Sequence, residues 1–214
     1  MKPATGSDSL TPVERYYRLQ SYIYDATRWS FLFGRDEPIA RVAKLGAPRT
    51  ILEVGCGTGR NLLRLARAFP QARVAGVDIS EEMLARAQRK IERRNPRIAL
   101  WRRRYDHPLR PAQGFDLIVF SYCLSMINPG WEQALASAGA DLAAGGRIAV
   151  VDFDASPSAA FKRWMGVNHV RMDGHLPPAL HQQFEPLVIT SRAVYGGLWS
   201  YFVFVGEARA TPAH

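Results

Sequence analysis

ILEVGCGTG, residues 51–59, carries the strongest structural signal in this sequence. The run Thr50–Val54 has the length and the β-branched content of a buried strand. Gly55, Gly57 and Gly59 then remove side chains where a backbone must lie flat against a bound nucleoside. Apolar residues recur at helical spacing after the last of these glycines. The stretch therefore predicts a glycine-rich turn between a strand and a helix, a kind of turn that binds nucleotides.

Three features distinguish this turn from the commoner nucleotide-binding turns. A phosphate-binding loop ends in Gly-Lys-Ser or Gly-Lys-Thr, whereas Arg60 and Asn61 stand here. The dinucleotide fingerprint requires a glycine at its sixth position, which Arg60 occupies. Glu53 at the end of the strand would repel a phosphate and attract an ammonium or a sulfonium. The pattern favours a nucleoside ligand that carries a positive amino-acid portion.

The motif Glu53-x-Gly-x-Gly-x-Gly59 resembles that of the class I S-adenosylmethionine-dependent methyltransferases. In that family the motif wraps the methionine and ribose parts of the cofactor. The resemblance therefore implies S-adenosylmethionine as cofactor and S-adenosylhomocysteine as product. It assigns cofactor contacts within the motif to Glu53, Gly55, Cys56, Gly57 and Gly59.

The next strand supplies a second acidic residue. Arg73–Val77 is a short apolar run, and Asp78 ends it 19 residues after Gly59. A carboxylate there accepts hydrogen bonds from both ribose hydroxyls, and with Ile79 it joins the predicted cofactor site. Asp78 alone would fit NAD equally well. The alternative is that Glu53 and Asp78 only cap strand ends.

Two further strands extend the predicted site. Ile98–Trp101 precedes Asp106, which the family places at the adenine, although an Asp before His-Pro is also a turn former. Phe115–Ser121 is the fourth strand, and its carboxyl end opens onto the crevice where parallel sheets bind ligands. We therefore expect Ser121 at the cofactor and Tyr122 at the substrate, near the reacting methyl.

The remaining elements complete an α/β pattern. Arg147–Phe153 is a fifth strand after a helix around 131–142, and Leu187–Tyr195 with Leu198–Val205 form a terminal hairpin. We predict a Rossmann-like methyltransferase fold, with a mostly parallel seven-stranded sheet, an antiparallel last strand and helices on both faces. Residues 1–45 are predicted to form a helical aromatic lid, and 46–214 the methyltransferase core with a substrate-binding insertion at about 154–185.

Composition restricts the setting of the protein. The chain has 214 residues, two cysteines outside any paired framework, and no apolar signal segment or membrane span, which favours a reducing, cytoplasmic setting. The net charge of +9 requires an acidic partner, and arginines crowd residues 86–104. Nucleic acid and an anionic membrane both meet this requirement. Charge alone does not choose between them.

Two segments outside the shared core are candidates for the substrate site. Residues 16–35 are heavily aromatic, and such side chains hold cationic amines or lie at a bilayer interface. Core packing is the alternative role for about half of them. Residues 161–176 contain His169, Arg171, Asp173 and His175. They contain neither cysteine nor a His-x-x-x-His spacing, so we expect no metal. An arginine that binds a carboxylate, beside a histidine or aspartate, is the favoured function there.

These two segments resemble those of the betaine-lipid N-methyltransferases, which convert diacylglycerylhomoserine to its trimethyl derivative. The resemblance rests on Tyr24–Trp29, on Asn168–Leu176 and on Gly197–Trp199 with Tyr201-Phe202. Bacterial phosphatidylethanolamine N-methyltransferases are the nearest alternative, followed by a soluble small-amine methyltransferase.

The resemblance implies roles for particular residues. The headgroup amine must lose a proton before it attacks the methyl, and Tyr24, His169 or Asp173 is predicted to take it. The predicted substrate-binding residues are Tyr16, Arg28, Tyr122 and Arg171. Arg28 or Arg171 is expected to bind the homoserine carboxylate.

A lipid substrate also requires docking at a membrane surface. We expect reversible, salt-sensitive association with the anionic inner face of the cell membrane. A nucleic-acid methyltransferase is disfavoured, because Ser121–Leu124 replaces the Asn-Pro-Pro-Tyr type of tetrapeptide. A protein that binds the cofactor without catalysis is disfavoured by the complete glycine motif.

Overall fold

The computed structural model describes residues 32–209, apart from 96 and 168. It divides into two units, Met1–Phe33 and Gly34–His214, and the second contains every helix and strand given below. Most of the predicted lid therefore lies outside the described residues.

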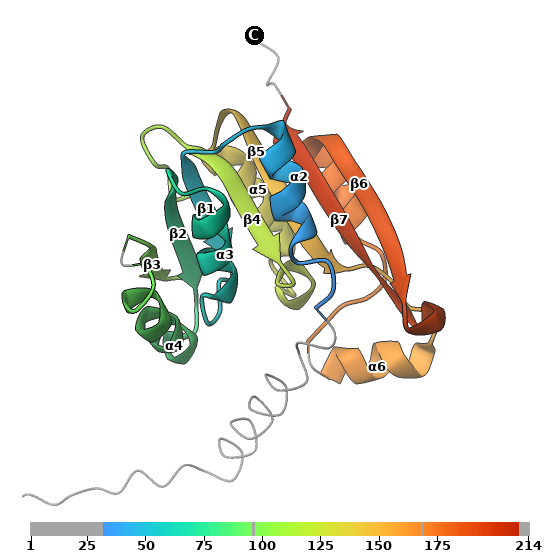
Figure 1. The fold of residues 1–214 in the computed structure, drawn as a ribbon. Helices are drawn as coiled ribbons and strands as arrows, with labels where there is room; N and C mark the ends of the chain where they lie inside the picture. Colours follow the sequence, from blue (N-terminus) through green and yellow to red (C-terminus); the bar gives the residue numbers. More distant parts are fainter. Residues whose placement is uncertain (1–31, 96, 168, 210–214) are drawn as a thin grey trace, which may run out of the picture. The chain divides into compact units, whose positions relative to one another are not determined.

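The second unit is built on a seven-stranded sheet with the order β3-β2-β1-β4-β5-β7-β6 (Figure 1). Strands β1 to β5 pair in parallel, whereas β7 pairs antiparallel with both of its neighbours. The predicted sheet and its antiparallel last strand are confirmed. The strands are β1 Thr50–Val54, β2 Arg73–Asp78, β3 Ala99–Arg102, β4 Phe115–Ser121, β5 Leu142–Phe153, β6 Phe184–Val194 and β7 Trp199–Ala208.

Helices cover both faces of this sheet, as predicted. One buried cluster joins the sheet to α2, α3 and α4, and the other joins it to α5 and α7. In Figure 1, α2 and α3 lie in front of the sheet and α5 lies behind it. The helices are α2 Glu37–Leu45, α3 Arg60–Ala68, α4 Glu81–Glu92, α5 Trp131–Asp141, α6 Ala159–Val167 and α7 Leu176–Gln183, with 3₁₀ turns η2 Leu124–Met126 and η3 Tyr195–Gly197.

The central strands are buried on both faces because alternate side chains enter different clusters. Ile51 of β1 packs with the α3 side, and Leu52 packs with the α5 side. Such strands show continuous apolar runs, which made them easy to recognise in the sequence.

One boundary differs from the sequence prediction. The fifth strand begins at Leu142, directly after α5, and not at Arg147. Leu142 pairs with Phe115 before a register shift, so Gly145 and Gly146 lie within the strand. An irregularity in the pairing, which the hydrophobic pattern does not encode, lengthens this strand.

The described residues contain no helix long and apolar enough to cross a membrane. Within the same residues no three potential ligands gather as a metal site. Both cysteines, Cys56 and Cys123, are free and buried. Acidic partners bind two arginines of the basic region, since Arg86 pairs with Glu82 and Arg102 with Glu81.

Asp141 anchors the loop that follows β3 to the end of α5. Its carboxylate is buried and accepts hydrogen bonds from the Tyr105 hydroxyl at 2.8 Å and from the backbone N–H groups of Leu109 and Arg110 at 2.8 and 2.7 Å. Three donors therefore depend on one side chain.

We predict that Asp141→Asn lowers the free energy of unfolding by about 2 kcal/mol, because an amide replaces one accepting oxygen with a donor. Urea denaturation measures the change. Glu132→Gln, an exposed change on the same helix, is the control and should alter stability by less than about 0.5 kcal/mol. Equal denaturation midpoints for Asp141→Asn and the control would contradict the anchoring role.

Candidate active site

The loop after β1 is held by the end of the neighbouring strand. The backbone N–H groups of Gly55 and Cys56 both donate to the Val77 carbonyl, at 2.9 and 3.1 Å. The Gly57 N–H donates to Asp78 Oδ2 at 2.8 Å. These bonds fix the backbone of the glycine motif without using any side chain of the motif itself.

The three motif glycines have different physical roles. Gly55, at φ 67°, has no room for a Cβ, which would lie 2.7 Å from Cys123 Cβ. Gly59 packs against α4, where an added Cβ would lie 3.0 Å from Ala87 Cβ. Gly57, at φ 52°, has no described atom within 4 Å of such a Cβ. The space beside Gly57 is therefore open to a ligand, whereas the other two glycines serve the packing of the protein.

Cys56 contributes only its backbone to the loop surface. Its side chain is buried in the core, and its Sγ would lie 2.8 Å from a Cβ at Gly76. Burial raises the pKa of the Cys56 thiol, which therefore stays protonated and unreactive.

Asp78 has a structural role beside its predicted ribose contact. Its Oδ1 accepts the Ser80 N–H at 2.9 Å while Oδ2 accepts the Gly57 N–H. Each carboxylate oxygen retains a second lone pair, so a ribose diol can still bind. The adjacent Ile79 is 64% exposed and offers an apolar surface next to the loop.

Glu53 is buried beneath the loop. Asn61 Nδ2 donates to Oε1 at 2.9 Å, and Oε2 is buried without a partner in the described structure. Desolvation by burial raises the pKa of Glu53 to about 8, although Asn61 and Arg35 act in the opposite direction. The sequence led us to expect an ionised carboxylate. The structure instead gives a carboxyl that is protonated at neutral pH until a cation approaches.

The side chains of Ser121 and Tyr122, at the end of β4, have different surroundings. Ser121 Oγ is buried and has no partner among the described atoms. Tyr122 has φ 54°, and its fully buried ring packs on Phe153 at 4.8 Å between centroids and beneath Arg35. We predicted that Tyr122 contacts the substrate, but its left-handed backbone directs the ring into the core.

Asp106 lies on the surface beyond β3. It hydrogen-bonds His107 Nδ1 at 3.0 Å, and this bond lowers the pKa of Asp106 below its ordinary value. The carboxylate is therefore ionised and exposed, as the predicted acceptor for an exocyclic amine must be.

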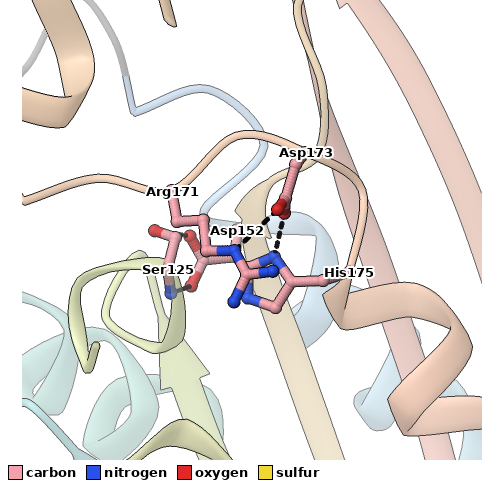
Figure 2. A network of polar contacts seen from close by, with 5 residues as sticks. All are labelled: Ser125, Asp152, Arg171, Asp173 and His175. Carbon is pink, nitrogen blue, oxygen red and sulfur yellow. Dashed lines mark hydrogen bonds and ion pairs between the residues drawn. The ribbon is translucent and has the colours of Figure 1, made fainter. Parts of the chain in front are cut away.

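A second polar network lies beyond the ends of β4 and β5 (Figure 2). Arg171 Nε donates to Asp173 Oδ2 at 2.6 Å, and His175 Nδ1 hydrogen-bonds the other oxygen of Asp173. The Ser125 hydroxyl donates to Asp152 Oδ1 at 2.6 Å, and the Arg171 N–H donates to the Ser125 carbonyl at 2.9 Å. One backbone bond thus connects the two side-chain groups.

Asp152 is fully buried in this network. Desolvation raises the pKa of Asp152 to about 6, while bonds from Ser125 and the backbone partly offset the increase. A carboxyl of this kind exchanges protons near neutral pH.

The predicted catalytic and substrate residues are brought together only in part. His169 is exposed on a left-handed turn at φ 60°. Arg171, two residues after it, forms an ion pair with Asp173. Desolvation raises the pKa of Asp173, but the bonds from Arg171 and His175 outweigh it, so the net pKa is lowered. Asp173 is therefore ionised at neutral pH, and its role as a proton acceptor stays a prediction. Tyr16, Tyr24 and Arg28 lie outside the described residues.

The sequence analysis missed two residues of this network, Ser125 and Asp152, and it noted His175 without giving it a role. Asp152 was detectable as the only charged residue in the apolar run Ile148–Phe153. A role for His175 was detectable by its spacing of two from Asp173. Ser125 carries no signal in the sequence, because its role comes from a contact across 27 positions.

Comparison with known proteins agrees with this geometry. Residues 51–146 match the family described as "Methyltransferase domain". The demethylmenaquinone methyltransferase of Thermus thermophilus is 33% identical over 142 residues, which is 64% of each chain. The chain covers less than two thirds of the length of the curated relatives it matches.

Solved structures share the fold. The N-methyltransferase NodS of Bradyrhizobium japonicum, in complex with S-adenosylhomocysteine, is 20% identical with a TM-score of 0.66 over 82% of this chain and 86% of that one. The 1,6-didemethyltoxoflavin-N1-methyltransferase of Burkholderia thailandensis is also 20% identical with a TM-score of 0.66, over 96% and 94%. The chain therefore has a Rossmann-like methyltransferase fold, and its residues 51–146 match a methyltransferase domain.

The buried Glu53 predicts a pH-dependent stability. Its pKa of about 8 in the folded state exceeds its ordinary value of 4.5, so its contribution is fully present below about pH 4.5 and is lost as the pH rises to 8. Relative to Glu53→Gln, the wild type should lose on the order of 4 kcal/mol of unfolding free energy between pH 5 and 8. Denaturation curves at several pH values measure this. Parallel stability profiles for the two proteins would contradict a buried, protonated Glu53.

Proposed function

We propose that this chain binds S-adenosylmethionine over Gly57 and transfers its methyl group to a nucleophile at the ends of β4 and β5. The observation that carries the proposal is an open space bordered by the glycine motif, near which Glu53 Oε2 and Ser121 Oγ are buried without partners. Such atoms cost stability unless a ligand binds them, so they support a polar ligand at this place.

The residues present fit that ligand. The remaining lone pairs of Asp78 suit the ribose hydroxyls, and the exposed Ile79 suits an adenine face. Glu53 ionises when a cation approaches and then pairs with the amino-acid portion. The cofactor supplies an electrophilic methyl on a sulfonium. The protein holds the nucleophile in line with that methyl, which is a proximity effect.

We predict that Gly57→Ala weakens S-adenosylmethionine binding at least about tenfold, because the new methyl group occupies the open space. Isothermal titration calorimetry measures the dissociation constant. Gly145→Ala is the matched control, since Gly145 also has a positive φ of 71° and no atom within 4 Å of an added Cβ.

The control separates backbone strain from loss of the ligand site. Both variants should lose a similar, small amount of stability, and only Gly57→Ala should lose affinity. Unchanged affinity in Gly57→Ala, or no binding by the wild type, would overturn the cofactor site.

For the acceptor, we propose an amine of a membrane-lipid headgroup, with diacylglycerylhomoserine first and phosphatidylethanolamine as the alternative. An exposed apolar surface supports this: Trp164 and Val167 of α6 are 51% and 69% exposed, and Tyr195 and Leu198 at η3 are also exposed. The Ser156 hydroxyl, in the loop before α6, donates to the Leu198 carbonyl at 2.6 Å and ties that loop to the end of η3.

Basic residues accompany that surface, which we call the α6–η3 surface. Lys162 and Arg163 are exposed on the same helix as Trp164. Aromatic and cationic side chains together suit the interface of an anionic bilayer. An enzyme docked in this way meets its lipid substrate in the membrane, and we therefore propose a peripheral location at the cytoplasmic face.

We predict that the chain binds vesicles containing phosphatidylglycerol and that high salt weakens this binding. Trp164→Ala should weaken it about tenfold, because one interfacial aromatic side chain is lost. Trp101→Ala is the control, since Trp101 is exposed on β3. Vesicle flotation measures the bound fraction, and equal binding by both variants would count against the α6–η3 surface.

The acceptor itself is identified by transfer of labelled methyl from S-adenosylmethionine. Separate vesicles carry diacylglycerylhomoserine, phosphatidylethanolamine or reduced demethylmenaquinone, and the last is included because of the Thermus relative. Label in the homoserine lipid supports the proposal, and label in phosphatidylethanolamine supports the alternative. Label only in the quinol, in soluble amines or in nucleic acid would overturn the lipid-amine acceptor.

A further inference from the structure

His175 has one ring nitrogen satisfied and one unsatisfied. It precedes α7 as the N-cap residue, and its side chain is only 12% exposed. Nδ1 hydrogen-bonds Asp173, whereas Nε2 is buried and has no partner within the described chain. A buried polar atom without a partner costs about 1–3 kcal/mol, so its presence calls for a physical explanation.

The partner on Nδ1 determines which nitrogen carries the proton. An ionised carboxylate only accepts hydrogen bonds, so Nδ1 must donate. The Arg171 guanidinium binds the other oxygen of Asp173 at 2.6 Å and keeps that carboxylate ionised. In the neutral ring, Nε2 then carries the lone pair and acts as an acceptor.

The surroundings fix the ring in place. Trp131 of α5 packs against it edge to face, with centroids 5.0 Å apart and planes at 63°. Asp173 forms a bridge with Ala155 just beyond β5, and the Arg171 N–H binds the Ser125 carbonyl in η2 beyond β4. The imidazole is therefore held at the carboxyl ends of β4 and β5, where the proposed function places the acceptor (Figure 2).

We propose that His175 Nε2 takes the proton from the methyl acceptor, with Asp173 and Arg171 as the residues that position it. This inference rests on the proposed function and deepens it. It selects acceptors whose nucleophilic nitrogen or oxygen carries a proton at neutral pH, such as an alkylammonium, an enol or a phenol.

The step balances as follows for an ammonium. The N–H bond breaks, its proton passes to Nε2, and its electron pair stays on nitrogen. That pair forms the new bond to the methyl carbon, while the pair of the carbon–sulfur bond remains on sulfur. The imidazolium then releases its proton to solvent, so one proton leaves per methyl transferred.

Charged groups lie on the Nδ1 side of the ring. Asp173 faces Nδ1 of the ring, and Arg171 lies on the far side of that carboxylate. The contact from α5 is the uncharged Trp131. Asp152, the next carboxyl, is connected to this group only through Ser125 and the backbone of Arg171.

The first test observes the tautomer in the full chain saturated with S-adenosylhomocysteine. Nitrogen NMR of the imidazole at neutral pH should show the proton on Nδ1 and a lone pair on Nε2. Asp173→Asn should convert this into a mixture, because an amide no longer requires a donor at Nδ1. A proton on Nε2 in the wild type would overturn the proposal whether or not an acceptor is known.

The second test measures methyl transfer to vesicles containing diacylglycerylhomoserine, or phosphatidylethanolamine if only that lipid is labelled. His175→Gln should lower kcat about 100-fold or more at neutral pH and remove the acidic limb of the pH–rate profile. Its dissociation constant for S-adenosylmethionine should stay within about twofold of the wild type. His181→Gln, a change on the same helix whose ring packs on Phe204, is the matched control.

The outcomes separate this inference from the proposed function. A His175→Gln protein with near wild-type kcat and an unchanged pH profile overturns the role of His175 and leaves the methyltransferase intact. A wild type that binds no S-adenosylmethionine overturns the proposed function instead. If the cofactor binds but neither lipid is labelled, the NMR measurement of the His175 tautomer is the test that supports or overturns the proposed role of His175.

Discussion

Three backbone hydrogen bonds at the carboxyl end of β1 are the constraint on which the site depends. The Val77 carbonyl accepts two of them and Asp78 accepts the third. They hold the loop against β2, so the chain enters α3 with the open side of Gly57 unfilled. The loop backbone also packs closely on Cys123 at Gly55 and on Ala87 at Gly59. The location of a ligand is thus set by main-chain geometry.

The same arrangement places polar atoms where only a ligand can bind them. Glu53 is desolvated and protonated in the isolated protein, and Ser121 Oγ and His175 Nε2 are buried acceptors or donors without partners in the described region. Each lowers the stability of the ligand-free chain. A ligand that binds these atoms stabilises the folded state by mass action, so binding and folding are coupled. Buried polar atoms without protein partners are typical of binding sites that are formed before the ligand arrives.

The sequence predicted the sheet and the glycine loop because both depend on local patterns. Buried parallel strands such as Thr50–Val54 show as apolar runs, and the glycine spacing is visible directly. The second network was predicted only in part, because its members come from η2, β5 and the loop before α7. Arg171 and Asp173 were noticed as residue types, but their pairing with each other and with His175 is a tertiary property. The inward turn of Tyr122 likewise follows from a positive φ that no pattern announces.

A crystal structure of the chain with S-adenosylhomocysteine tests the central claim most directly. We expect density for the ligand across Gly57, with its ribose at Asp78 and its amino group at Glu53. Density for the ligand at another place, or no ligand density at saturating ligand concentration, would contradict it.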